Sequence, residues 1–259
     1  MKKARFAVIG GTGLEEAFPE GRRMRVGTPY GPSAPIILAS VASKEVVFLA
    51  RHGEKHSVPP HKINYRANIW ALHNLGVERI LASNAVGGVN PKLKPGDFLI
   101  PSDFIDFTHS RPSTFYDEAP VTHVDASSVY CPELREVLSK ATSIEKVKAL
   151  ESGVYLCTNG PRYESPAEIR GFRSLGCDVV GMTGLPEAVL AHELGLCYTS
   201  LCYVTNMAAG MAGKVIAEEV DARGRHMGES IKRIILTALE TIPKKRSCNC
   251  SESLEGARV

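Results

Sequence analysis

The stretch FAVIGGTGLEEAF, residues 6–18, begins as an apolar strand and runs into three glycines that surround Thr12. A backbone with so few side chains can approach an anion closely, and Thr12 adds a hydroxyl donor beside several backbone N–H groups. A tight strand-to-loop turn without any ligand accounts for the same residues equally well. The stretch by itself therefore leaves both interpretations open.

Two common phosphate-binding loops do not fit this stretch. A dinucleotide-binding loop needs G-x-G-x-x-G and an acidic residue about 20 positions further on. Gly11 and Gly13 fill the first two places, but Glu16 stands in the third and no acid follows at the ribose-reading distance. No Gly-Lys-Ser/Thr follows either, so a P-loop is excluded. A nicotinamide oxidoreductase is thus disfavoured, whereas a non-catalytic nucleoside- or phosphate-binding protein stays open at this point.

The composition is that of an ordinary globular protein. The chain has 259 residues, of which 44% are hydrophobic and 23% charged, enough for one sizeable core. A formal net charge of +3 is too small to indicate nucleic acid or a membrane surface as a partner. The N-terminal residues do not resemble a signal peptide, and no apolar run approaches the ~20 residues of a membrane span. We expect a cytoplasmic protein.

Strand-like and helix-like segments alternate along the chain, which predicts one α/β domain around a partly parallel sheet. The predicted strands are residues 4–9, 35–41, 46–50, 79–83, 97–101, 153–158, 178–182 and 197–205, the second and third forming a hairpin. The predicted helices are residues 65–75, 166–175, 186–194 and 217–239. Ser165 and Glu168 form the capping box of the second helix. We expect residues 1–243 to form the domain, and residues 244–259 to form a polar, loosely held tail with a C-x-C motif.

Polar side chains stand where several predicted strands end, and in an α/β sheet such ends share one ligand site. They are Thr12, the pair Arg51-His52, Asn84, Glu164, Thr183 and Asn206. Each could be an ordinary solvated loop residue, but their joint occurrence argues for one site. Arginine grips phosphate through two parallel hydrogen bonds, so a phosphate-sized anion fits this set.

No dedicated metal site is expected from the sequence. The seven cysteines are scattered widely, whereas zinc sites prefer two close pairs. Cys248 and Cys250 form a C-x-C, a spacing that can bind a soft metal or form a small redox-active ring. The other cysteines are expected to be buried apolar residues.

Seven ordered motifs resemble those of the trimeric nucleoside phosphorylases, the group that holds purine nucleoside phosphorylase and methylthioadenosine phosphorylase. They are IGGTGL, ARHGEKH, INYRANIWAL, PGDFLIPSDFID, NGPRYES, GMTGLPEAVLAHELG and VTNMAAG, spread over residues 6–242. The resemblance implies the nucleoside phosphorylase fold, with a mixed, partly barrel-like sheet surrounded by helices. It also implies reversible phosphorolysis of a purine nucleoside to free base and ribose 1-phosphate in purine salvage. Orthophosphate would be a co-substrate, with no cofactor.

The resemblance also implies roles for individual residues. Asn206 and Glu164 would be the catalytic, purine-reading residues. The phosphate site would comprise Thr12, Arg51, His52, Asn84, Ala85 and Thr183. The nucleoside site would comprise Tyr163, Met182, Ala208, His56, His123, Ala217 and Val220. His123 would reach in from a neighbouring subunit, which implies a homotrimer or a hexamer made of two trimers.

The motifs divide between two branches of the family. ARHGEKH and NYRANIWAL are similar to the methylthioadenosine branch, whereas Glu164, Asn206 and SNAVGGVN are similar to the branch that acts on inosine and guanosine. We expect a preference for 6-oxopurine nucleosides, closest to the archaeal type. Phosphorolysis of methylthioadenosine or methylthioinosine is the alternative. Relatives from hyperthermophilic archaea carry a C-x-C and internal disulfides, which here would involve Cys248 with Cys250 and a bridge between Cys131 and Cys202.

Overall fold

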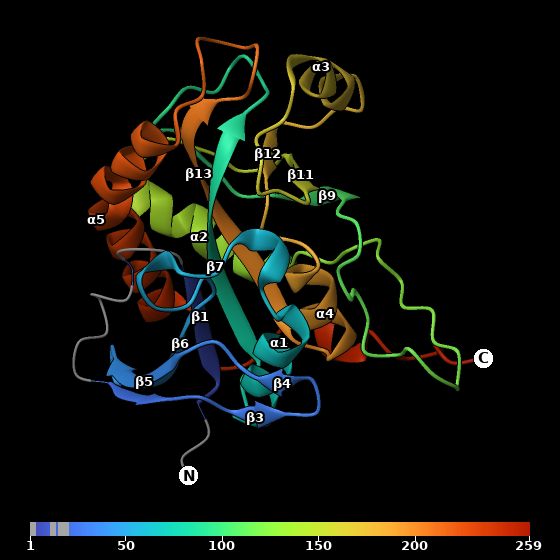
Figure 1. Cartoon of the computed structure of the whole chain (residues 1–259). Helices are drawn as coiled ribbons and strands as arrows, with labels where there is room; N and C mark the ends of the chain where they lie inside the picture. The colour runs from blue at the N-terminus through green and yellow to red at the C-terminus, as the bar shows by residue number, and fades with distance from the viewer. Residues whose placement is uncertain (1–3, 11–13, 15–20) are drawn as a thin grey trace.

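Strand β7 (Arg79–Gly88) is the centre of the computed structural model, which describes residues 4–10, 14 and 21–259. One edge of β7 pairs in parallel with β13 (Cys197–Met207) along its whole length. The other edge pairs first with β1 (Phe6–Gly10), in parallel, and further on with β12 (Val179–Gly181), antiparallel. The sheet therefore divides beyond Ala82, the last residue of β7 in register with β1 (Figure 1).

The main sheet has eleven strands and mixed directions. Its order is β10-β8-β13-β7-β1-β6-β5-β2, and β12, β11 and β9 branch from β7. Its remaining strands are β2 (Arg22–Met24), β5 (Ile36–Val41), β6 (Lys44–Ala50), β8 (Phe98–Leu99), β9 (Asp103–Phe107), β10 (Ala149–Leu150) and β11 (Val154–Thr158). The predicted hairpin is confirmed, since β5 and β6 pair antiparallel. A separate ribbon joins β3 (Gly27–Thr28) to β4 (Gly31–Pro32).

Five α-helices accompany the sheet within the described part of the chain. They are α1 (Tyr65–Asn74), α2 (Pro132–Ile144), α3 (Pro166–Ser174), α4 (Glu187–Glu193) and α5 (Ala217–Thr241). The capping box is present: the Ser165 hydroxyl accepts from the Glu168 amide, and the Glu168 carboxylate accepts from the Ser165 amide. Local sequence thus fixes the start of α3.

The helices divide between the two faces of the sheet. Buried side chains of α1 and α4 share one core cluster, and those of α2 and α5 share another. Strand β13 supplies both, with Tyr198 and Cys202 in the first cluster and Cys197 and Leu201 in the second. This alternation is the period of two that a strand imposes on its side chains. The fold is the α/β arrangement that the sequence predicts, with one mixed central sheet.

Several features of the fold differ from the sequence prediction, among them five short strands that were not predicted, β2, β3, β4, β9 and β10. Strands β7 and β13 continue past Ser83 and Thr205, where loops were expected, because the two strands pair along their full length. Gly88 permits this close pairing, since a Cβ there would lie 3.0 Å from the Met207 sulfur. Helix α2 was not predicted, although Pro132 and the apolar spacing of its buried residues were available signals.

The C-terminal tail is packed against the domain, so the prediction of a loosely held tail is wrong. Cys250 and Ala257 are buried. The Ser247 amide and hydroxyl both donate to the Glu133 carboxylate, at 2.6 and 2.7 Å. The Glu133 carboxylate also pairs with the buried Arg79 guanidinium at 3.1 Å, so one acidic side chain joins the tail, α2 and β7. Nowhere in the described chain is a helix long and apolar enough to cross a membrane.

We expect Glu133→Ala to lower the free energy of unfolding by about 3 kcal/mol, because it leaves the buried charge of the Arg79 guanidinium without its carboxylate. Urea unfolding followed by circular dichroism measures this change. Glu136→Ala is the matched control, because Glu136 lies on the same helix in an exposed pair with Lys140. Equal effects of the two variants would contradict the role given to the buried pair.

Candidate active site

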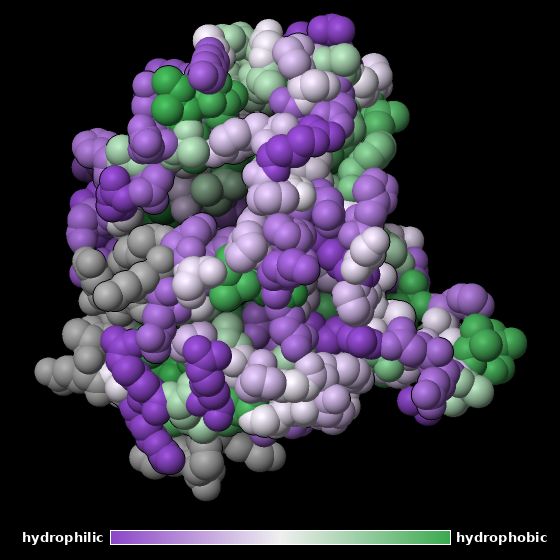
Figure 2. All heavy atoms as spheres, viewed as in Figure 1, coloured by the Kyte–Doolittle hydropathy of each residue, from purple (hydrophilic) through white to green (hydrophobic). Residues whose placement is uncertain are grey.

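A cavity of about 380 Å³ lies where the sheet divides, and Figure 2 shows this face hollowed beside α5. Most of the predicted site residues line it. They are Arg51, His52, His56, Ala85, Tyr163, Glu164, Met182, Thr183, Asn206, Ala208, Ala217 and Val220. Residues far apart in the sequence are thus brought to one place by the ends of β6, β12 and β13 and by the start of α5.

Arg51 is buried at the end of β6 and is held by a bidentate ion pair. Its Nε and Nη2 donate to the two carboxylate oxygens of Glu187, both at 2.7 Å, and its Nη1 donates to the Ser83 carbonyl at 3.1 Å. Burial lowers the pKa of Arg51, but the charge and hydrogen bonds of Glu187 outweigh it and raise that pKa. A guanidinium has five N–H groups, so after these three bonds two N–H groups remain for a ligand.

His52, the next residue, is held as a neutral imidazole. Its Nδ1 lies 2.8 Å from the Val58 carbonyl, which can only accept, so Nδ1 carries the proton and Nε2 is an acceptor. Burial and the positive charges of Arg51 and His56 lower the pKa of His52 to about 3. The His56 ring stacks on the His52 ring with centroids 4.1 Å apart.

The hydroxyl of Thr183 is positioned by the buried side chain of Asn84. The Asn84 amide donates to the Thr183 hydroxyl at 2.7 Å, and the Ser200 hydroxyl donates to the Asn84 carbonyl. The Thr183 oxygen therefore acts as acceptor toward Asn84, and its own proton remains to be donated into the cavity. Asn84 itself does not line the cavity and is buried within β7, where the sequence placed it in a loop.

Asn206 is aimed into the cavity by an irregularity in β13. The register with β7 shifts between Val204 and Asn206, as in a β-bulge, which redirects a side chain. The Asn206 carbonyl accepts from the Thr205 hydroxyl at 2.9 Å, and its amide donates to the Met207 carbonyl at 2.9 Å. A carboxamide has two donors and two acceptor sites, so Asn206 keeps one of each.

Glu164 lines the cavity, and its carboxylate is held by a neighbouring hydroxyl. The Thr158 hydroxyl donates to its carboxylate at 2.7 Å. Burial raises the pKa of Glu164, and the hydrogen bond from Thr158 opposes this shift. Nearby, Gly160 packs on Met182, since a Cβ there would lie 2.6 Å from the Met182 sulfur. Gly160 also has a φ of +62°, so glycine suits both its conformation and its contact.

A further predicted residue, His123, stands apart from this cavity. His123 is exposed on the segment before α2, where its backbone amide donates to the Ala257 carbonyl at 2.8 Å. Figure 1 shows this segment and the C-terminal tail together at the edge of the molecule. Thr12 lies outside the described residues.

The sequence prediction missed several residues that build the cavity. Asp221 and Arg225 line it from α5 and form an ion pair with each other. Asp221 follows the predicted Ala217 by four residues, so helical spacing was the available signal. Glu187 is missing from the predicted set too, and only the folded chain brings its carboxylate to Arg51.

The lowered pKa of His52 predicts a loss of stability in acid. The neutral ring contributes stability above the unfolded pKa of about 6.5, and this contribution is lost as the pH falls toward 3. In phosphate-free buffer, we expect His52→Asn to show a smaller fall in Tm between pH 7.5 and pH 5 than the parent chain. His73→Asn, at an exposed position on α1, should behave as the parent chain does. An unchanged fall in His52→Asn would contradict this assignment.

Known proteins resemble this chain over nearly its whole length. Residues 5–240 match the Phosphorylase superfamily. The chain is 52% identical to a 6-oxopurine nucleoside phosphorylase of Pyrococcus furiosus, with 98% of each chain covered. It is 51% identical to a probable S-methyl-5′-thioinosine phosphorylase of Methanopyrus kandleri, covering 97% of this chain and 98% of that one.

Solved structures show the same fold. A methylthioadenosine phosphorylase from an antarctic soil metagenomic library superposes with a TM-score of 0.95 at 32% identity, covering all of this chain and 93% of that one. The methylthioadenosine phosphorylase of Schistosoma mansoni, in complex with adenine, gives 0.92 at 30% identity, with 99% of each chain covered. The chain belongs to the phosphorylase superfamily, within the group of purine nucleoside and methylthioadenosine phosphorylases.

Proposed function

We propose that the protein catalyses the reversible phosphorolysis of purine nucleosides and prefers the 6-oxopurines inosine and guanosine. The observation that carries this proposal is that one cavity holds both donors for an anion and a donor–acceptor pair for a base. Arg51 and Thr183 offer N–H and O–H groups to an anion, and Asn206 offers one donor and one acceptor to a base. The named activity of the Pyrococcus furiosus relative supports the same substrate class.

The proposed phosphate site follows from the hydrogen-bonding groups that remain on each side chain after its bonds within the protein. The two remaining N–H groups of Arg51 and the hydroxyl proton of Thr183 are donors for phosphate oxygens. The Nε2 of neutral His52 accepts from a protonated phosphate oxygen. Asn84 acts through Thr183, by fixing the direction of its hydroxyl. Thr12 is proposed as a further donor, on the resemblance alone.

The base half concerns the charge that develops during the reaction. Phosphate attacks C1′ as the bond to the base breaks, so positive charge builds on the sugar and negative charge on the base. A donor and an acceptor that meet the departing base stabilise this state more than the ground state. Asn206 donates to O6 and accepts from a protonated N7, and ionised Glu164 accepts from N1–H. Adenine presents the opposite pattern at N1 and N6.

Hypoxanthine release from inosine tests the reaction type. We expect release, under single-turnover conditions, only when phosphate is present, with ribose 1-phosphate formed in equal amount. Thr183→Val, which keeps the shape and removes the hydroxyl, should raise the KM for phosphate by about tenfold or more and leave nucleoside affinity nearly unchanged. Release without phosphate would indicate a hydrolase, and saturable binding without turnover would indicate a binding protein.

Asn206→Asp tests the base preference. Its carboxylate accepts from the adenine N6 amino group and, when protonated, donates to N7, so the ratio of adenosine to inosine turnover should rise about tenfold or more. Asn74→Asp, at an exposed position of α1, is the control and should leave the ratio unchanged. Parent enzyme that cleaves adenosine better than inosine would contradict the roles of Glu164 and Asn206.

One observation favours a second candidate, phosphorolysis of 5′-methylthioinosine. Ala217, Val220 and Gly224 line the cavity from one face of α5 and offer small, largely apolar surface at the proposed 5′ end. The Methanopyrus kandleri relative is named for this activity. We expect 5′-methylthioinosine to be cleaved about as well as inosine, and kcat/KM for the two substrates decides. Ala217→Leu should impair the methylthio substrate more, whereas Ala222→Leu, exposed on the same helix, should not. Rejection of 5′-methylthioinosine by the parent enzyme would remove this candidate.

The proposal includes a cytoplasmic homotrimer, or a hexamer of two trimers, with His123 donated to a neighbouring site. The exposed position of His123, on an edge that also carries the exposed Val121 and Val259, supports this arrangement. Figure 2 shows hydrophobic residues at the tip of that projecting edge. Sedimentation of the full chain as a monomer at micromolar concentration would exclude a shared site.

A further inference from the structure

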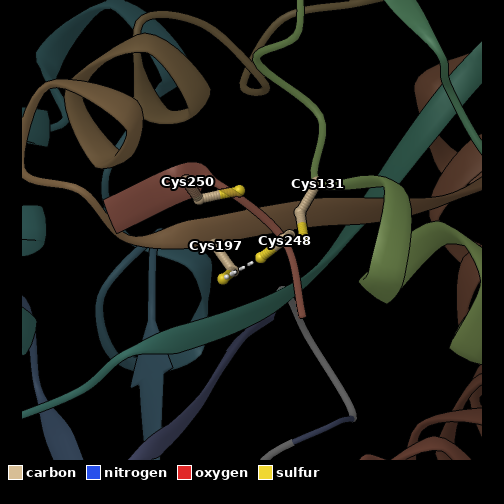
Figure 3. A group of neighbouring side chains, drawn as sticks. All are labelled: Cys131, Cys197, Cys248 and Cys250. Carbon is tan, nitrogen blue, oxygen red and sulfur yellow. Dashed lines mark hydrogen bonds between the residues drawn. The ribbon is translucent and has the colours of Figure 1, made fainter. Parts of the chain in front are cut away.

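Four cysteines from separate parts of the chain meet beneath the C-terminal tail. Cys131 is the N-cap residue of α2, Cys197 is the first residue of β13, and Cys248 and Cys250 belong to the tail. All four sulfurs lie within 4.8 Å of one another, and the Cys197 and Cys248 sulfurs are 3.4 Å apart. Figure 3 shows the four side chains gathered in one place, with a dashed line between Cys197 and Cys248. The wide spacing in sequence therefore does not keep them apart.

This arrangement also corrects the expected bridge between Cys131 and Cys202. The sulfur neighbours of Cys131 are those of Cys197, Cys248 and Cys250. Cys202 is buried elsewhere, with its sulfur 3.8 Å from the Ser200 hydroxyl. All seven cysteines are free thiols in the structure.

We propose that Cys131, Cys197, Cys248 and Cys250 bind one zinc ion as a tetrathiolate structural site. Sulfurs placed about 2.3 Å from a tetrahedral zinc lie about 3.8 Å from one another. The separation of 3.4 Å between the Cys197 and Cys248 sulfurs and the upper limit of 4.8 Å for all pairs bracket that edge length. Three of the four cysteines are buried and the fourth, Cys248, is half-buried, as a closed structural site requires. Metal binding replaces the four thiol protons.

The surroundings suit the net charge of about −2 that four thiolates leave around a zinc ion. The Arg246 guanidinium lies 3.9 Å from the Cys197 sulfur and is fixed by donating to the Gly195 carbonyl at 3.0 Å. Cys131 stands at the N-terminus of the 13-residue helix α2, where the helix dipole favours negative charge. The Arg246 guanidinium and the N-terminus of α2 therefore both place positive potential beside the four sulfurs.

Disulfides are the competing chemistry of the same four sulfurs. Two disulfides would each join two sulfurs at about 2.05 Å. Neither bond would require a sulfur to lie near the other three. The single shared centre is what a metal ion demands of its ligands. The geometry therefore favours one tetrahedral site over two bridges.

Such a site would attach the tail to the domain directly after Ser247, which donates to Glu133. Beyond Cys250, the Ser253 hydroxyl donates to the His192 carbonyl at 2.7 Å. Further on, the Ala257 carbonyl accepts from the His123 amide. Zinc at the cluster would thus stabilise the edge that carries His123. This proposal concerns a different site from the proposed catalysis and does not depend on it.

The experiment uses the full chain, purified anaerobically with reductant and then dialysed against zinc-free buffer. We expect close to one zinc per chain by elemental analysis. Replacement by Co²⁺ should give the thiolate charge-transfer and ligand-field absorption bands of a tetrahedral cobalt site. The Cys248→Ser and Cys250→Ser double variant should lose both signals, and stripping zinc should lower Tm in the parent chain but not in that variant. Cys177→Ser, a buried cysteine outside the cluster, is the matched control and should keep one metal per chain.

Three results would overturn the proposal. The first is a folded, reduced parent chain that retains no zinc after reconstitution. The second is one zinc per chain retained by the double variant. The third is non-reducing mass spectrometry that finds the four cysteines joined in two disulfides in protein isolated anaerobically with thiols blocked at lysis.

Discussion

The ion pair between Arg51 and Glu187 is the contact on which the site depends. Both side chains are buried, and removing two charges from water is costly unless their hydrogen bonds are satisfied. Here the two parallel bonds are joined by one from Arg51 to the Ser83 carbonyl and one from the Tyr198 hydroxyl to Glu187, at 2.8 Å. The network ties the end of β6 to α4, β7 and β13, and it leaves the guanidinium with a single orientation.

The division of the sheet explains why the cavity lies where it does. Because β1 ends and β12 takes over on the same edge of β7, the sheet opens beside the ends of β6 and β12. Arg51 and His52 follow the first of these ends, and Thr183 follows the second. The shifted register of β13 adds Asn206 from the opposite edge. Strand pairing therefore sets the position of the cavity, and the strand ends and the register shift place polar side chains in it.

The sequence predicted those features that are determined by local sequence patterns. The hairpin of β5 and β6, the capped start of α3 and the cluster of polar strand ends were all readable, because periodicity and capping act within a few residues. The extension of β7 past Ser83 was not, since glycines that suit a loop also suit a tightly paired strand. The tail looked free because its partners, Glu133 and Cys197, lie 114 and 51 residues away in the chain. Contacts of that range, including the four-cysteine cluster, depend on tertiary structure.

The central claim is that Arg51, aligned by Glu187, holds phosphate through a fork of two N–H groups. Arg51→Lys tests it most directly, because lysine keeps the charge that Glu187 requires but has no planar fork. Steady-state kinetics with both substrates varied should show the KM for phosphate raised by about 10- to 100-fold. Equilibrium binding of inosine should change by less than about twofold. An unchanged phosphate KM, or equal weakening of phosphate and inosine, would contradict the account.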